Sequence, residues 1–386
     1  MALSCPVCAR RVETPFAEIR GVPVHVSALH RSANGARTAY RGDLELAFCE
    51  SCGFIWNAAY DAALVAYDAD YENSLDHSPA FAGYVEGLAG RLVERYGLHG
   101  ARVAEIGCGQ ADFLHRLCAA GAAAGFGFDP SYVGPERDGP VTVKRELYAP
   151  GTVNGTDPDL VCCRHVLEHV EHPLELLRSL RRTLDPARGV PVYFEVPNGE
   201  HQLREGVVWD MIYAHFATFT RPSLRTLFEL AGFEVLDTGT AFGGQYLWIE
   251  ARPTAHPVRA PRAQEVDAVR ELVREFASGY DALVGAWRRR VDGYTSSGRR
   301  VALWGAGAKG VTLVNALERT GDIGVVVDVN PRKHGSFVPG AGVPVVAPSA
   351  LGEYTPDVVV VANPIYRDEV AAALSAMGQH AVVVCV

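Results

Sequence analysis

The 386-residue chain lacks the sequence features that direct a protein to a membrane, to nucleic acid or out of the cell. No stretch approaches the run of roughly 18 apolar residues that a membrane helix needs. The net charge of −9 leaves no overall basic surface that could neutralise phosphates. The first residues also lack the charged and apolar regions of a signal peptide. We therefore expect a cytoplasmic protein with a small-molecule substrate and with neither a nucleic-acid nor a membrane partner.

Disulfides are not indicated either, although the chain has nine cysteines. Five of them are scattered in apolar contexts, as is usual for thiols in a reducing compartment. The remaining four form two Cys-x-x-Cys pairs: Cys5, Cys8, Cys49 and Cys52. Two such pairs can supply the four thiolates of a tetrahedral zinc site, which leaves no open position for water. We expect a structural Zn²⁺ in an N-terminal zinc-binding module; the alternative is four unrelated cysteines.

Beyond this module, strand-like and helical segments alternate, which is typical of an α/β fold with a doubly wound, mostly parallel sheet. A helix is predicted to begin at Ser78-Pro79, and two extended runs near residues 232–236 and 245–251 suggest an antiparallel pair at one sheet edge. A proline-rich linker and a long amphipathic helix follow, and then the α/β pattern repeats. These observations predict three domains, over residues 1–77, 78–254 and 255–386.

A glycine turn, Glu105-Ile-Gly-Cys-Gly109, follows the first strand of the central domain. Gly107 and Gly109 would let the backbone approach a ligand, and Glu105 can accept hydrogen bonds from a charged amine. Asp129, at the end of the next strand, can hold two ribose hydroxyls. With Asp129-Pro-Ser, this pattern resembles the S-adenosylmethionine (SAM) site of class I methyltransferases, while a purely structural tight turn is the alternative.

Polar side chains also follow the fourth and fifth predicted strands. They are His165, Glu168, His169, Glu195 and Asn198. Residues at the carboxyl ends of parallel strands face a shared ligand crevice, so these side chains are expected to point toward a substrate. Each of them could instead be a satisfied polar group, and Glu168 and His169 could brace the strand-to-helix turn.

The C-terminal domain carries Gly305-x-Gly307-x-x-Gly310, a full dinucleotide fingerprint, with Asp328 further along the chain. One interpretation is therefore an NAD-dependent oxidoreductase with a fused module. Lys309 and the segment Asn330-Pro-Arg-Lys333 fit instead a pocket for a substrate's diphosphate, where amides and ammonium groups meet anionic oxygens.

In their order along the chain, these motifs resemble the zinc-containing, SAM-dependent C-methyltransferases that act on nucleotide-linked deoxysugars. The motifs concerned are the four paired cysteines, Glu105-Ile-Gly-Cys-Gly, Asp129-Pro-Ser, Arg164-His-Val-Leu-Glu-His, Glu195-Val-Pro-Asn, the Tyr213/His215 segment, Gly305-Ala-Gly-Ala-Lys-Gly310 and Asp328-Val-Asn-Pro-x-Lys333. The resemblance implies a central class I methyltransferase domain, a C-terminal Rossmann-like domain that anchors the nucleotide, and a role in antibiotic or other natural-product biosynthesis.

The resemblance also implies residue roles. His215 would remove a proton from the carbon next to a ketone, and Tyr213 would hydrogen-bond the developing oxyanion, with His169 beside them. The expected SAM-binding set is Glu105, Gly107, Cys108, Gly109, Asp129, Pro130 and His165. The expected substrate-binding set is Glu195, Asn198, Lys309, Asn330 and Lys333.

Two departures from the family pattern keep alternatives open. The family segment normally has the sequence Tyr-Glu-His, and its glutamate is Ala214 here. An O- or N-methyl acceptor, which needs less basic assistance, is therefore a second interpretation, and a non-catalytic binding protein a third. The stretch from Tyr67 to Ser74 matches the family's tyrosine-rich substrate lid only in part.

Overall fold

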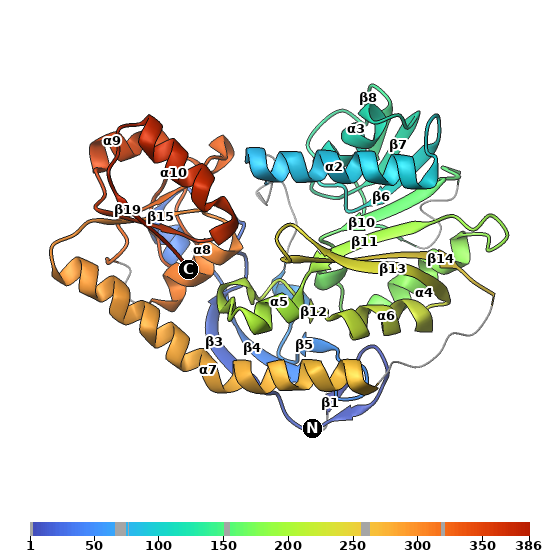
Figure 1. Cartoon of the computed structure of the whole chain (residues 1–386), viewed down its shortest axis with the longest axis horizontal. Coiled ribbons are helices and arrows are strands. Elements are labelled where there is room, and N and C mark those ends of the chain that lie inside the picture. Colours follow the sequence, from blue (N-terminus) through green and yellow to red (C-terminus); the bar gives the residue numbers. More distant parts are fainter. Residues whose placement is uncertain (1–2, 66–74, 76, 150–154, 256–262, 318–320) are drawn as a thin grey trace.

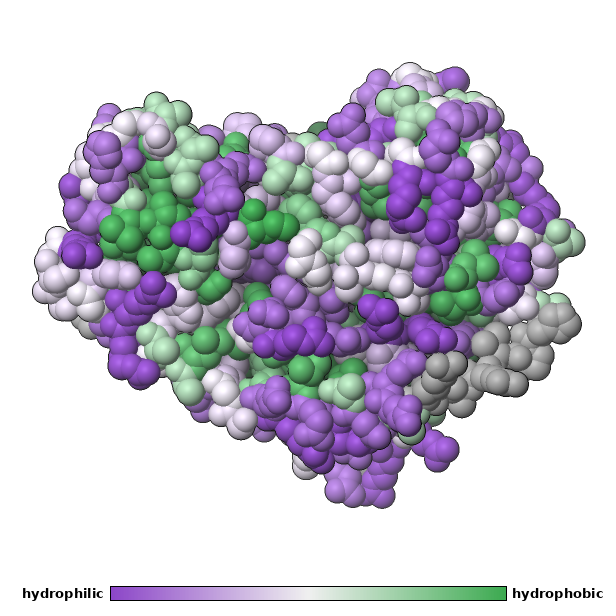
Figure 2. Space-filling view, viewed as in Figure 1, coloured by the Kyte–Doolittle hydropathy of each residue, from purple (hydrophilic) through white to green (hydrophobic). Residues whose placement is uncertain are grey.

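The computed structural model describes residues 3–65, 75, 77–149, 155–255, 263–317 and 321–386, so the stretch 67–74 lies outside the described residues. Two α/β lobes stand side by side above an N-terminal sheet, and one long helix runs beneath (Figure 1). The molecular surface is hollowed between the two lobes (Figure 2).

The N-terminal part consists of two small antiparallel sheets. β1 (Leu3–Ser4) pairs with β2 (Arg11–Val12), and the turn between them carries the first cysteine pair. The second sheet has the order β12-β5-β4-β3 and consists of β3 (Ala17–Pro23), β4 (Arg41–Phe48), β5 (Ile55–Asn57) and β12 (Ala217–Thr218). The second cysteine pair lies in the turn between β4 and β5, and the short helix α1 is Ala33–Arg37. Because β12 comes from far along the chain, the N-terminal sheet is completed by the segment that contains His215.

The central lobe is an eight-stranded sheet of order β13-β14-β11-β10-β6-β7-β9-β8. Its strands are β6 (Arg102–Ile106), β7 (Ala124–Phe128), β8 (Arg137–Asp138), β9 (Val141–Lys144), β10 (Leu160–Arg164), β11 (Val192–Pro197), β13 (Phe233–Ala241) and β14 (Tyr246–Pro253). The five strands β9, β7, β6, β10 and β11 run parallel, and β14 is antiparallel to both of its neighbours. The predicted parallel sheet with an antiparallel pair at one edge is confirmed.

Helices cover this sheet, and the strand-to-helix connections bring its ligand-facing ends together. The helices are α2 (Pro79–Tyr96), α3 (Asp112–Ala119), α4 (Pro173–Thr183), α5 (Gly199–Arg204) and α6 (Arg221–Leu230). The predicted start at Ser78-Pro79 is confirmed, because the Ser78 side chain accepts the Phe81 amide and Pro79 occupies the first turn. Gly97 ends α2 in the left-handed conformation that favours glycine.

The C-terminal lobe begins with α7 (Ala263–Ser296), which leads into a parallel sheet of order β17-β16-β15-β18-β19. The strands are β15 (Val301–Trp304), β16 (Val325–Val327), β17 (Val345–Val346), β18 (Val358–Val361) and β19 (Val382–Cys385), and the helices are α8 (Ala308–Ala316), α9 (Leu351–Tyr354) and α10 (Arg367–Ala376). The apolar face of α7 is buried as the helical spacing predicts.

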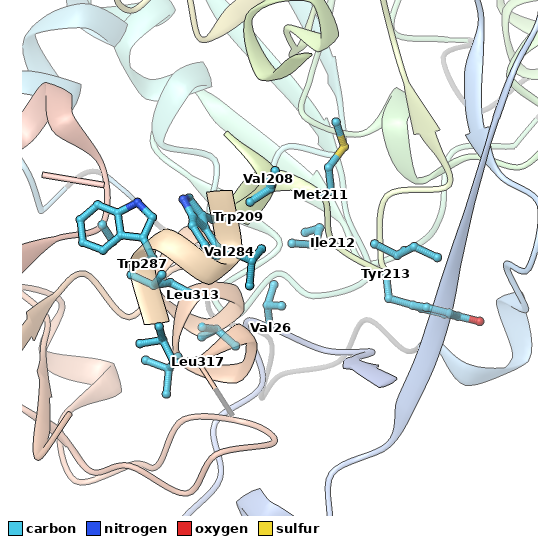
Figure 3. Packing of buried hydrophobic residues seen from close by; sticks show 14 of the residues in the cluster. Val26, Val208, Trp209, Met211, Ile212, Tyr213, Val284, Trp287, Leu313 and Leu317 are labelled. Atoms are coloured by element: carbon cyan, nitrogen blue, oxygen red, sulfur yellow. The ribbon is translucent and has the colours of Figure 1, made fainter. Parts of the chain in front are cut away.

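One hydrophobic core joins the N-terminal sheet to the C-terminal lobe. It contains Leu44 of β4, Val273 of α7 and Val301 of β15. Trp209 and Ile212, from the segment that follows α5, pack into the same cluster beside Val284 and the α8 helix (Figure 3). The segment that carries His215 is therefore held between the N-terminal sheet, the central lobe and the C-terminal lobe. The predicted domain boundaries stay a prediction.

Candidate active site

The glycine turn after β6 adopts a backbone that only glycine accommodates without strain. Gly107 and Gly109 have φ values of +67° and +53°, and a Cβ on Gly107 would overlap the Val166 side chain. The Asp129 carboxylate accepts the Gly109 amide at 2.8 Å and the amide and hydroxyl of Ser131 at 2.8 and 2.6 Å. The structure thus brings Asp129 to the turn, where its carboxylate closes the loop.

The other predicted residues of this turn differ in exposure. Glu105 and Cys108 are buried, and Pro130 is exposed. Burial raises the pKa of the Cys108 thiol, so that side chain stays neutral. A ligand at the turn would therefore meet backbone amides and carboxylates rather than a thiolate.

A cavity of about 250 Å³ lies between the central and C-terminal lobes. The central lobe contributes His165, Glu168, His169, Asp210 and His215 to its wall. The C-terminal lobe contributes the Gly305 to Gly310 turn with Lys309, together with Asp328, Asn330 and Lys333. Residues predicted from two separate domains therefore line one cavity.

His165 stands at the junction of the cavity and the sheet. Its φ of +55° is unusual for a residue with a side chain and marks local strain. Its Nε2 lies 3.2 Å from Glu195 Oε1, and its Nδ1 lies 3.7 Å from Glu168 Oε1. Burial lowers the pKa of His165, but the adjacent carboxylates of Glu168 and Glu195 outweigh this and raise the pKa to about 9. His165 is therefore a cation at neutral pH.

Glu195 does not line the cavity but lies buried behind it. It stands directly opposite Arg164 across the β10–β11 register, with Arg164 Nε 3.2 Å from its Oε1. The Tyr193 hydroxyl donates to Oε2 at 2.8 Å, and the Tyr84 hydroxyl donates to the same oxygen. Burial opposes ionisation, but Arg164 and His165 together lower the pKa of Glu195 to about 2. Glu195, which was predicted to bind the substrate, therefore lies behind His165 and pairs with its ring instead.

His169 and His215 face each other across the cavity wall. Their ring centroids are 4.8 Å apart, and a carboxylate oxygen of Glu168 lies within 4.8 Å of a ring nitrogen of each. Burial lowers the pKa of both imidazoles, that of His215 to about 4, and the neighbouring His169 contributes to the latter shift. Both rings are neutral at pH 7 and are in the protonation state that a general base requires.

The two predicted lysines are already paired. Lys309 Nζ lies 3.1 Å from Asp210 Oδ2 of the opposite lobe and donates to Gln245 Oε1 at 3.4 Å. Lys333 Nζ lies 3.3 Å from Asp328 Oδ2 and donates to the Ala306 carbonyl. Both still line the cavity, so an anionic ligand would meet two lysines whose charges are balanced by carboxylates.

Besides Glu195, Tyr213 and Asn198 of the predicted catalytic and substrate-binding residues are not brought to the cavity. The Tyr213 ring lies against Gly42 of β4, and its hydroxyl accepts the Asp61 amide at 2.9 Å. Figure 3 shows Tyr213 directed away from its neighbour Ile212, which lines the cavity instead. Asn198 caps α5 and donates to the Gly244 carbonyl. The hydrogen bond predicted from Tyr213 to an oxyanion is therefore not supported, because β4 and the segment at Asp61 occupy that side chain.

Sequence reasoning missed Asp210, which the Gln202 amide and Lys309 hold at the cavity. Glu168 was expected from its place after a strand to point toward a substrate but received no specific role; it is 1% exposed and lines the cavity. No such local signal exists for Asp210, because it acquires its place through the packing of two lobes.

The four paired cysteines come together at the N-terminal sheet. Cys5 Sγ lies 3.7 Å from Cys52 Sγ, Cys8 Sγ lies 3.5 Å from Cys49 Sγ, and all four sulfurs lie within 4.8 Å of one another. A tetrahedral Zn²⁺ with Zn–S bonds of about 2.3 Å separates its sulfurs by roughly 3.8 Å. The donor set and its spacing therefore fit such an ion.

Comparisons with known proteins agree with this architecture. Residues 81–238 match the model of a methyltransferase domain, and residues 248–385 match that of a C-methyltransferase C-terminal domain. The central lobe thus has the class I methyltransferase fold predicted from its sequence. These two matches, together with the relative described next, support a SAM-dependent C-methyltransferase family for this chain.

One curated relative is the C-methyltransferase NovU of Streptomyces niveus, which is 29% identical over 209 residues. The match covers 51% of this chain and spans about half, 49%, of the length of that relative.

Similar solved structures include magnesium protoporphyrin IX methyltransferase from Synechocystis PCC 6803 with bound SAH, at 21% identity and a TM-score of 0.36, covering 45% of this chain and 84% of that chain. Another is 1,6-didemethyltoxoflavin-N1-methyltransferase from Burkholderia thailandensis, at 16% identity and a TM-score of 0.34, covering 46% of this chain and 81% of that chain. Within the described part of the chain, no helix combines the length and apolar character needed to cross a membrane.

Proposed function

We propose that this chain transfers a methyl group from SAM to a carbon next to the ketone of a nucleotide-linked keto-deoxysugar, in the biosynthesis of a natural product. The observation that carries the proposal is the cavity between the lobes, in which two neutral histidines of the methyltransferase domain face the glycine turn and lysines of the C-terminal domain. The match of residues 248–385 to a C-methyltransferase C-terminal domain and the similarity to a C-methyltransferase support it.

The donor site would be formed by Glu105, Gly107, Cys108, Gly109, Asp129 and Pro130, with His165 at the edge of the cavity. Nothing lies within 4 Å of the place where a Cβ on Gly109 would stand, so a ligand can approach the backbone there. Bound there, SAM would supply an electrophilic methyl group.

The proposed chemistry of the chain is proton removal by His215. The acceptor's C–H bond breaks, its electron pair stays on the acceptor as an enolate, and the proton moves to a ring nitrogen of His215. The enolate carbon would then form the new C–C bond to the methyl group while the bond between that methyl group and the sulfur of SAM breaks. The electron pair of the broken bond would stay on sulfur, so that S-adenosylhomocysteine leaves. A positioned base contributes typically about 10²–10⁴-fold to such a reaction, and alignment of the reacting atoms contributes the rest.

We also propose that Cys5, Cys8, Cys49 and Cys52 hold a structural Zn²⁺, since their sulfur spacing suits that ion. The ion would fix the turn between β4 and β5 and, through the shared sheet, the segment with β12. The five-stranded C-terminal lobe is proposed as a Rossmann-like domain that binds the acceptor's nucleotide, with Lys309, Asn330 and Lys333 near its diphosphate.

A second candidate acceptor is favoured by the charges of the cavity. Four carboxylates line its wall, on Glu168, Asp210, Asp328 and Glu369, against the two lysines and the protonated His165. This excess of negative charge favours an acceptor without a diphosphate, and Ala214 leaves His215 without an adjacent carboxylate in its own segment. Methylation of oxygen or nitrogen on another secondary metabolite therefore stays a second candidate.

Binding and transfer assays separate these candidates. Calorimetry on zinc-loaded full-length protein should detect binding of SAM and S-adenosylhomocysteine, whereas heat with NAD alone would support an oxidoreductase. Methyl transfer from labelled SAM to nucleotide-linked keto sugars and to matched sugars without the nucleotide should then identify the acceptor, and NMR of the product locates the new methyl group. Absence of heat with both SAM and S-adenosylhomocysteine would remove the proposed function.

His215→Asn tests the base. We expect it to leave donor affinity nearly unchanged and to abolish methyl transfer to carbon, because Asn has the shape of the ring edge but accepts no proton. Unchanged turnover would remove His215 from the mechanism.

A further inference from the structure

Glu168 is a buried carboxylate for which the proposed mechanism has no use. It is 1% exposed, lines the cavity, and follows β10 in the short helical turn Leu167–His169. Its Oε1 faces His165 at 3.7 Å, while its Oε2 has no hydrogen-bond partner among the described residues. His165 lowers the pKa of Glu168 despite its burial, so the side chain stays ionised. A buried anionic oxygen without a donor is costly, which indicates that a donor approaches it in the working enzyme.

His169 cannot be that donor while it is neutral. Its Nδ1 lies 2.8 Å from the Ala214 carbonyl oxygen, which only accepts hydrogen bonds, so Nδ1 carries the ring hydrogen and Nε2 does not. His165 faces the other oxygen, Oε1, and His215 is the remaining imidazole within 4.8 Å of the Glu168 carboxylate. A short movement would bring a ring N–H of His215 within hydrogen-bond distance of Oε2.

Asp210 is the other carboxylate that acts on His215, and its Oδ2 is already paired. Lys309 Nζ lies 3.1 Å from its Oδ2, and the Gln202 side-chain amide donates to the same oxygen at 3.2 Å. The charged groups around the His215 ring are thus Glu168, Asp210 with Lys309, and His165 behind Glu168, with neutral His169 alongside. Of these, Glu168 has the oxygen that is open to a new hydrogen bond.

We propose that Glu168 is the positioning residue of His215: Oε2 accepts one ring N–H, which fixes the tautomer and turns the other ring nitrogen toward the acceptor. This inference rests on the proposed function and explains how the base can work although position 214 is alanine. The neighbouring carboxylate also stabilises the imidazolium that forms when His215 takes the proton. Catalytic hydrogen bonds are often long before substrates bind and shorten in the complex.

The test compares Glu168→Gln with Glu168→Asp, Asp210→Asn and the exposed Glu175→Gln in the holoenzyme loaded with zinc and S-adenosylhomocysteine. ¹⁵N NMR of labelled imidazoles, with His215 assigned by His215→Gln, reports the tautomer. We expect the wild type, Asp210→Asn and Glu175→Gln to keep His215 in one tautomer, Glu168→Gln to mix the two, and Glu168→Asp to retain a partial bias. Methyl transfer by Glu168→Gln, measured with the acceptor that the transfer assays select, should fall by about 10- to 10⁴-fold with an unchanged KM for SAM.

An unchanged His215 tautomer in Glu168→Gln would overturn the inference, as would a loss of melting temperature alone with no change in tautomer. A divalent ion bound at Glu168, His169 and His215 would also overturn it, because a metal would then take the nitrogen assigned to the base. Metal analysis after exposure to Mn²⁺, Co²⁺ or Zn²⁺ should therefore find no ion beyond that of the cysteines. Calorimetry with S-adenosylhomocysteine on each variant keeps the two proposals distinct, since failure of the proposed function abolishes donor binding in the wild type as well.

Discussion

Replacement of Glu195 by alanine should destabilise the central lobe far more than any surface change. Its side chain is fully buried and pairs with Arg164, whose side chain is only 8% exposed, so removal leaves a buried guanidinium without its counter-charge. Breaking one partner of a buried pair costs about 3–5 kcal/mol. The hydroxyls of Tyr84 and Tyr193 lose their acceptor as well, at roughly 1 kcal/mol each where water does not replace it. We expect a loss of about 3–7 kcal/mol in the free energy of unfolding of this lobe, depending on whether water replaces the lost acceptor.

The assay is urea unfolding at pH 7, followed by tryptophan fluorescence and far-ultraviolet circular dichroism. At this pH the pair contributes fully, because the pKa of Glu195 is lowered to about 2 and its stabilisation is lost only as the pH falls toward that value. Glu18→Ala is the matched control, since Glu18 and Arg20 form an ion pair with side chains 55% and 57% exposed, and such pairs contribute within about 1 kcal/mol. A Glu195→Ala variant within 1 kcal/mol of the wild type, with a raised KM for the acceptor, would refute this reasoning and restore the substrate-binding role.

Three further predictions concern the metal, the base and the glycine turn. Cys52→Ser should lose the single bound zinc and lower the melting temperature, measured by metal analysis and calorimetry, whereas Cys118→Ser should keep the metal. Burial lowers the pKa of His215 from its ordinary value of 6.5 to about 4 in the folded protein, so the unfolded chain binds more protons than the folded chain between these pH values. As the pH falls from 6.5 to 4, the wild type should therefore lose up to about 3 kcal/mol of unfolding free energy relative to His215→Gln, measured by urea unfolding at each pH. Gly107→Ala should weaken S-adenosylhomocysteine binding at least about tenfold in calorimetry, because its Cβ overlaps Val166 at a φ that disfavours alanine; Gly97→Ala, with a similar φ and open space around it, should bind normally.

The sequence indicated local structure well, because the signals it carries are local. The cap at Ser78, the antiparallel edge pair and the glycine turn each depend on neighbours within a few residues, and all three appear in the structure. The place of Tyr213 depends instead on β4, far away in the chain, and its side chain turned out to pack there. Likewise the Arg164 and Glu195 pair follows from the strand register, which β10 and β11 do not reveal by alternation because they are buried on both faces.

In both α/β lobes an aspartate accepts backbone amides at the glycine turn, and this shared feature limits what the glycine motifs indicate about ligands. In the central lobe Asp129 accepts the amides of Gly109 and Ser131, and in the C-terminal lobe Asp328 accepts those of Ala306 and Asn330, all at 2.8 Å. An aspartate at the end of the second strand is therefore explained in both lobes by closure of the glycine turn, whichever nucleoside binds. The difference between the lobes lies in what surrounds each turn. Neutral histidines and a buried carboxylate stand on the central side of the cavity and paired lysines on the other, so the choice between donor and acceptor sites follows from this asymmetry rather than from the glycine motifs.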